Sequence, residues 1–188
     1  TPRYGSVRVG ATTIALALDE PADADWKIYV DVNGNGDLTD DGDGQWSAKR
    51  TNGNRTQYGV NRYKLPVTWD LGDGKTAMGE YGLAFYRFSD QDALLMYREA
   101  VRVGELTLDG KAHKAALVEN DADGIYNKTV ASVDEARKSR PVWLLIDLND
   151  NGRFESRAGE GIDVRAPFKL GDATYEANIS TDGGTLKL

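Results

Sequence analysis

The chain has 188 residues, a formal net charge of −7, a single histidine and no cysteine. This length allows one domain with a sizeable core or two small packed halves. Without cysteine the chain has no disulfides, thiolate metal sites or cysteine nucleophiles, and one histidine, His113, is a poor basis for zinc or copper chemistry. The acidic balance disfavours nucleic acid and anionic membranes as partners and suits cation binding or plain solubility.

The sequence shows no signal peptide, transmembrane run or lipidation motif. It opens TPRYG rather than with Met, so we expect a mature form or a part of a longer protein. Hydrophobic residues make up 40% of the chain and fall into short runs, which indicates a folded protein.

Short apolar or alternating runs between turn dipeptides predict a mostly β chain. The expected strands cover residues 4–9, 12–18, 26–32, 64–71, 76–88, 94–103, 105–108, 113–119, 142–148, 166–170, 174–179 and 185–188. Between them, turn pairs such as Asp73-Gly74 and Asp109-Gly110 suit tight hairpins. We therefore expect an all-β fold, mostly antiparallel and sandwich-like, with at most one or two short helices.

One helix is expected from the capping box that begins at Ser132 and ends at Glu135. The polar stretch 47–63 is expected to form a long loop. We treat residues 1–188 as a single β-rich domain, with duplicated halves 1–92 and 93–188 as an open alternative. Duplication is suggested by short matches: VRVG at 7–10 and 101–104, and Leu-Gly-Asp at 71–73 and 170–172.

Three acidic loops, each after an aliphatic strand, share one pattern. Oxygen-bearing side chains occupy positions 1, 3 and 5 and glycine occupies position 6, in Asp31-x-Asn33-x-Asn35-Gly36, Glu119-x-Asp121-x-Asp123-Gly124 and Asp147-x-Asn149-x-Asn151-Gly152. Calcium takes six to eight oxygen ligands, and glycine at position 6 allows the sharp turn such a loop needs. Further oxygens are expected from positions 7 and 9: Asp37 and Thr39, Ile125 and Asn127, Arg153 and Glu155.

These segments resemble the DxDxDG calcium-binding loops of EF-hands, dockerins and thrombospondin type 3 repeats, set in what looks like a bacterial extracytoplasmic β-rich domain. The resemblance implies a ligand role for positions 1, 3 and 5. The EF-hand glutamate at position 12 is missing, so other carboxylates must close the loops. Those expected are Asp40, Asp41 or Asp43 in the first loop and Glu155, Glu160 or Asp163 in the third, whereas the second has only Asn127 and then Asp134 and Glu135.

Three functions remain open from the sequence. The first is a non-catalytic accessory or adhesion-type module of a secreted, periplasmic or cell-surface protein, with two or three Ca²⁺ ions stabilising the strand ends. The second is a calcium-dependent carbohydrate-binding module that stacks sugars on Trp46, Tyr58, Tyr63 and Trp69. An alternative for the same segment is an acidic partner, indicated by Arg50, Arg55 and Arg62. The third is a carboxylate-based hydrolase, for which no catalytic residue can be named. Calcium is the expected partner, with a carbohydrate or another extracellular protein as further ones, but no nucleic acid and no membrane insertion.

Overall fold

The computed structural model describes residues 1–155 and 159–188. As the sequence predicts, the described chain is all-β with antiparallel pairing and contains one short helix. The chain divides into two compact units: unit 1 comprises residues 1–70 and 76–99, and unit 2 comprises residues 71–75 and 100–188.

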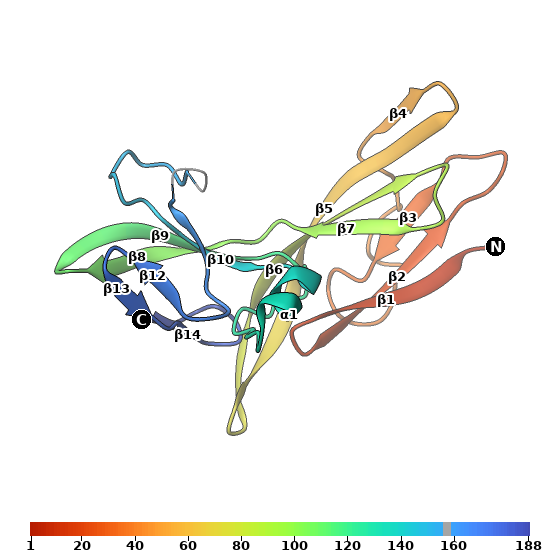
Figure 1. The fold of residues 1–188 in the computed structure, drawn as a ribbon. Coiled ribbons are helices and arrows are strands. Elements are labelled where there is room, and N and C mark those ends of the chain that lie inside the picture. Colours follow the sequence, from red (N-terminus) through yellow and green to blue (C-terminus); the bar gives the residue numbers. More distant parts are fainter. Residues whose placement is uncertain (156–158) are drawn as a thin grey trace. The chain divides into compact units, whose positions relative to one another are not determined.

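Unit 1 contains two antiparallel sheets, which can be followed in Figure 1. The first has the order β1 (Arg3–Val9), β2 (Thr12–Asp19), β3 (Lys27–Val30), and the second has the order β4 (Lys49–Asn52), β5 (Arg55–Gly72), β6 (Lys75–Phe88), β7 (Leu94–Arg98). Alternate residues of the long strands are buried, as in a sandwich-like core. They include Leu16, Leu18, Ile28, Leu65, Val67, Trp69, Leu83 and Phe85.

Unit 2 is built on a four-stranded antiparallel sheet with two small hairpins (Figure 1). The sheet has the order β11 (Gly161–Asp163), β10 (Val142–Ile146), β9 (Lys111–Glu119), β8 (Arg102–Leu108), and the hairpins are β12 (Phe168–Leu170) with β13 (Ala173–Tyr175) and β14 (Asn178–Ile179) with β15 (Leu186–Lys187). The aliphatic run predicted as a central strand is β10, and its Val142, Leu144 and Ile146 are fully buried.

The predicted helix is confirmed as α1 (Val133–Lys138). The hydroxyl of Ser132 accepts the N–H of Glu135 at 3.2 Å, and the Glu135 carboxylate accepts the N–H of Ala131 at 2.7 Å, so both partners of the capping box hold the first turn. No helix in the described part of the chain is long and apolar enough to cross a membrane.

The prediction of a long loop over residues 47–63 is wrong. These residues form β4 and the first half of β5, joined by a two-residue turn between the paired residues Asn52 and Arg55. The segment lacks the alternation of apolar residues that predicts a strand. Its inward-facing residue Asn61 is polar and is satisfied by hydrogen bonds, and arginines line the outer face. The expected strand 94–103 is also wrong, since β7 ends at Arg98 and β8 begins at Arg102.

The sheets β1-β2-β3 and β8-β9-β10 share one register. Gly5 faces Leu16 in the first and Gly104 faces Ala115 in the second, and each hairpin closes with a two-residue turn. Just beyond the third strand, Asp31 and Asp147 each donate a main-chain N–H to the second strand at 3.0 Å. The repeated arrangement is therefore structural, and it differs from the VRVG match because Val7 lies within β1 whereas Val101 precedes β8.

Candidate metal-binding loops

The three predicted loops share one backbone conformation. Positions 4 and 6 are left-handed in each: φ is 76°, 61° and 57° at Gly34, Ala122 and Asp150, and 81°, 70° and 79° at Gly36, Gly124 and Gly152. The glycine at position 6 therefore has the conformational role predicted for it. Position 4 is left-handed even where it is not glycine, as at Ala122 and Asp150. Hydrogen bonds within the loop therefore impose this conformation.

The carboxylate at position 1 gathers main-chain N–H groups of its own loop. Asp31 is 4% exposed, and its two oxygens accept the N–H groups of Gly34, Asn35 and Gly36 at 2.8–3.1 Å. Asp147, 3% exposed, accepts those of Asn151 and Gly152 at 3.0 and 2.8 Å in the same way. Each loop is thus wrapped around a buried carboxylate at the end of its strand.

A second carboxylate closes each of these two loops at position 2, the residue after the buried aspartate. In the first loop the N–H of Val32 donates to Asp41 at 3.1 Å, and in the third the N–H of Leu148 donates to Glu160 at 3.1 Å. Asp41 stands at position 11 and Glu160 at position 14. The two acids thus accept the equivalent main-chain N–H from different positions in their loops.

A third carboxylate faces the asparagine amides. The side-chain amide of Asn35 donates to Asp40 at 2.8 Å in the first loop, and that of Asn151 donates to Glu155 at 3.0 Å in the third. Asn33 and Asn149, at position 3, donate to the same carboxylates at 3.3 and 3.5 Å. The first and third loops therefore bring together equivalent oxygen sets, one in each unit.

The closing carboxylate of the first loop is incompletely satisfied. Oδ2 of Asp41 is buried and has no hydrogen-bond partner within the described residues. Burial is the main cause that raises the pKa of Asp41; the N–H groups of Val32 and Asn33 oppose it, and the charges of Asp40 and Asp31 add to it. A buried, unpaired carboxylate oxygen beside two other carboxylates favours a cation at this point.

The donor set is suited to a hard cation. Among residues 1–155 and 159–188, no group of three or more His, Cys, Asp or Glu side chains is placed to hold a metal ion. A metal here would need asparagine and main-chain oxygens beside the carboxylates, which calcium accepts and zinc does not favour. An asparagine carbonyl has two lone pairs, so one that accepts a main-chain N–H keeps a second for a cation.

The second loop has a cation of its own. The ammonium group of Lys128 lies 2.5 Å from Asp121 and 2.8 Å from Asp123, the residues at positions 3 and 5. Burial lowers the pKa of Lys128, but the two carboxylates outweigh burial and the pKa lies above its ordinary value. Position 10 of this loop is thus a lysine where the first loop has Asp40. The ammonium group thus compensates the two carboxylates of this loop from within the chain.

Substituting Lys128→Met should expose this difference. Without calcium the variant should be destabilised by about 1–3 kcal/mol, because Asp121 and Asp123 repel each other once the ammonium is removed. Calcium should restore part of that loss and add one bound equivalent, as measured by urea unfolding and isothermal titration. Lys114→Met, an exposed lysine on β9, is the control and should leave the calcium stoichiometry unchanged.

Other predicted ligands are engaged elsewhere. Asp37 accepts the N–H and hydroxyl of Thr39, whose hydrogen bonds lower the Asp37 pKa. Asp43 accepts the N–H of Gln45, and Asp163 pairs with Arg165. The remaining predicted ligands make single hydrogen bonds. The N–H of Ile125 donates to Asp123, the side-chain amide of Asn127 donates to Thr181, and the N–H of Arg153 donates to Asn151.

The aromatic residues predicted to stack on sugars lie mostly inside unit 1. Trp69 is 1% and Tyr58 is 7% exposed. Tyr58 stacks on Trp26 with ring centroids 4.7 Å apart, and Tyr63 packs edge-on against Phe85 at 5.9 Å. Trp46 is half-buried, 6.2 Å from Tyr58, and its buried indole N–H has no hydrogen-bond partner within the described residues. These rings are packed within unit 1 and do not form an open platform.

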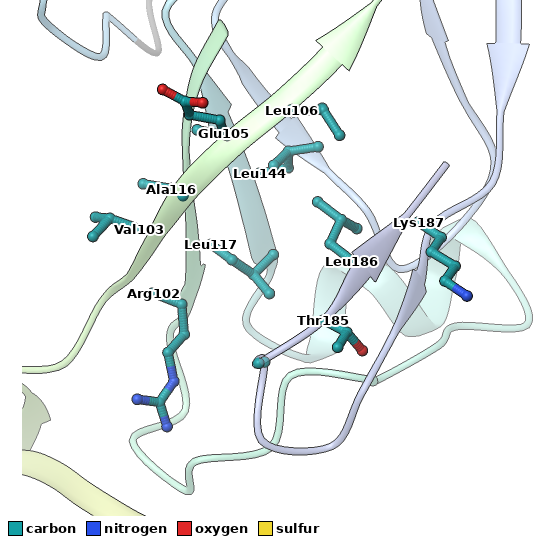
Figure 2. A pocket seen from close by; sticks show the side chains of 14 residues that line it. Arg102, Val103, Glu105, Leu106, Ala116, Leu117, Leu144, Thr185, Leu186 and Lys187 are labelled. Carbon is teal, nitrogen blue, oxygen red and sulfur yellow. The ribbon is translucent and has the colours of Figure 1, made fainter. Parts of the chain in front are cut away.

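Unit 2 has a shallow groove of about 380 Å³ between the face of β8 and β9 and the strand β15 (Figure 2). Leu106, Leu117, Leu144 and Leu186 converge on it, and Arg102, Glu105 and Lys187 lie at its margin. Arg102 is engaged through the main-chain carbonyl of Asp182 at 3.0 Å. The groove shares no lining residue with the three loops.

No family model, curated protein or solved structure matches this chain.

Proposed function

We infer that this chain is a non-catalytic, calcium-binding β module in which the first and third loops each take one Ca²⁺. The metal is structural: it neutralises the loop carboxylates and fixes the ends of β3 and β10. Two ions are proposed rather than three, because Lys128 supplies the positive charge in the second loop.

The observation that carries the proposal is the equivalence of the first and third loops. Each has a buried aspartate at position 1, asparagines at positions 3 and 5, a left-handed backbone at positions 4 and 6, and two further carboxylates. In a solvated turn without a cation, bringing several carboxylates close together costs free energy, because like charges repel. Yet both loops do so with acids that stand at different positions in the sequence. A bound cation removes that cost.

The same loops support an extracytoplasmic location. Asparagine replaces aspartate at positions 3 and 5 of both loops, so each has fewer charges than a high-affinity site. Affinity should fall to about 0.1–1 mM, the range of extracellular modules that work at millimolar calcium. An accessory or adhesion-type role in a secreted, periplasmic or surface protein follows from a metal that stabilises rather than signals.

Asp41→Asn tests the proposal because it should move stability in opposite directions with and without calcium. A raised pKa means that ionised Asp41 costs the folded protein stability at neutral pH, and the cost is relieved as pH falls through that pKa. The neutral amide should therefore melt at the same temperature as the parent or higher in EDTA. In calcium it should lose the increment due to one ion.

Asp43→Asn is the matched control, since Asp43 is an exposed acid of the same loop region. It removes the same charge and should keep the full calcium increment. Equal calcium increments in the parent and Asp41→Asn would contradict the assignment of Asp41 to a metal site.

A further inference from the structure

The outer face of the sheet β4-β5-β6-β7 carries a row of aromatic rings. Phe85 and Arg87 of β6 are buried in the core, so strand alternation places Tyr86 and Phe88 on the opposite face. Tyr97 of β7 is paired with Ala84, which lies two residues before Tyr86 on β6, so Tyr97 is on the same face as Tyr86 and Phe88. Tyr86 lies 5.7 Å from Phe88 and 5.9 Å from Tyr97, measured between ring centroids. All three rings are half-buried, so their edges reach the surface.

Cationic side chains border this row. Arg55 lies over the ring of Phe88 at 3.8 Å and pairs with Asp90, and Arg62 pairs with Glu99 at 3.0 Å. Arg50 and Lys64 are exposed and have no acidic partner within the described residues. On a chain with a net charge of −7 this face is locally basic.

A hollow of about 280 Å³ lies beside the rings. It is lined by Ser47, Ala48, Arg50, Gln57, Gly59, Val60 and Arg62. Arg50 and Gln57 are directly paired across β4 and β5, so their side chains point to the same face. The hollow thus presents two guanidinium groups and an amide.

The wall of the hollow is fixed by hydrogen bonds of Ser47 and Asn61. The side-chain amide of Asn61 accepts the N–H of Ser47 at 2.7 Å and donates to the carbonyl of Gln45 at 2.9 Å. The Ser47 hydroxyl donates to the carbonyl of Val60 at 2.7 Å. A Cβ at Gly59, where φ is +105°, would lie 2.8 Å from the carbonyl of Phe85, so a side chain is excluded there. The hollow is therefore a built feature of the β4–β5 hairpin.

We propose that this outer face binds a uronic acid polysaccharide, with a sugar carboxylate at Arg50 and Arg62 and the sugar rings against Tyr86, Phe88 and Tyr97. Aromatic edges and faces suit the apolar C–H surface of a pyranose, and the arginine fork suits a planar carboxylate. The binding surface lies in unit 1 and is independent of the calcium proposal.

The charge balance selects a carboxylated chain over other polyanions. Among the described residues of this face, Arg50 and Lys64 have no acidic partner, whereas Arg55 and Arg62 are paired with Asp90 and Glu99. A densely sulfated chain or a nucleic acid needs many uncompensated cations, and its closely spaced charges would meet these two acids. One carboxylate on each sugar ring matches the sparse charge better.

The test is titration of the intact protein, in one calcium buffer, with a hexamer of galacturonic acid, a hexamer of galactose and heparin. The galacturonate hexamer should bind, and the other two should bind at least tenfold more weakly. Arg50→Gln should weaken galacturonate binding about tenfold, because it removes a charge-assisted hydrogen bond. Tyr97→Ala should also weaken it, because it removes one of the three rings of the row.

The matched control is Arg8→Gln, which removes an exposed arginine from β1 in the other sheet of unit 1. Its affinity should stay within twofold of the parent, and all variants should melt within a few degrees of it. Heparin binding as tight as galacturonate binding, no galacturonate binding, or equal losses in Arg50→Gln and Arg8→Gln would each overturn the proposal.

Discussion

Calcium at 10 mM is expected to raise the melting temperature by about 6–20 °C over that in EDTA. A dissociation constant of about 0.1–1 mM makes each bound ion worth about 1.4–2.7 kcal/mol at this concentration. Two ions then contribute about 3–5 kcal/mol, and a chain of this size shifts by roughly 2–4 °C per kcal/mol. Thermal unfolding by circular dichroism, beside a metal count on protein dialysed against calcium, measures both the shift and the stoichiometry.

Magnesium is the control for this measurement. It demands near-octahedral geometry and retains its waters, so at 10 mM it should give less than about a third of the calcium shift. The metal count should be two. Three bound ions would contradict the role given to Lys128, and superimposable melting curves with no bound metal would leave the loops as ordinary turns.

The loop conformation could be predicted from sequence because each part of it is local. An aspartate after an aliphatic strand, alternating oxygen-bearing residues and glycine at position 6 specify a turn around one carboxylate, and Gly36 and Gly152 have the left-handed backbone that this requires. The closing acids could not be predicted in the same way. Asp41 and Glu160 stand at positions 11 and 14, and only the folded loop shows which of several acids turns inward.

Lys128 was visible in the sequence as a reversal of charge at position 10 of the second loop. Its meaning depends on distance, because a lysine nine residues after Glu119 can equally point to solvent. The structure places its ammonium between Asp121 and Asp123. The second loop is therefore the weakest candidate for a calcium site because of this lysine, and not only because it has no closing carboxylate.

The strands that sequence patterns missed are those with few apolar residues. Most of the predicted strands are confirmed because hydrophobic periodicity reports burial directly. The β4–β5 hairpin escapes this signal: its outer face carries Arg50 and Arg62, and its inner face buries Asn61. A buried amide satisfied by main-chain partners costs little, but nothing in the sequence shows that those partners are present.

Replacing the position 1 aspartates should have the largest effect of any loop substitution. Asp31→Ala leaves the N–H groups of Gly34 and Gly36 without an acceptor and leaves that of Asn35 with only the side-chain oxygen of Asn33, so it should cost about 2–4 kcal/mol even in EDTA. It should also abolish the calcium increment of one ion. Asp147→Ala should behave alike in unit 2, with a smaller loss in EDTA because two N–H bonds are broken rather than three.

Asp31→Asn separates the two contributions. The amide oxygen can still accept the N–H groups of Gly34 and Asn35 but leaves that of Gly36 without an acceptor, so the loss in EDTA should be smaller than for Asp31→Ala. The lost charge should still weaken calcium binding, and urea unfolding with and without calcium measures both terms. Asp43→Ala is the charge-matched control and should keep both ions. If Asp31→Ala lost stability in EDTA but kept the full calcium increment, Asp31 would be a turn residue, and the metal would have to be sought among other carboxylates.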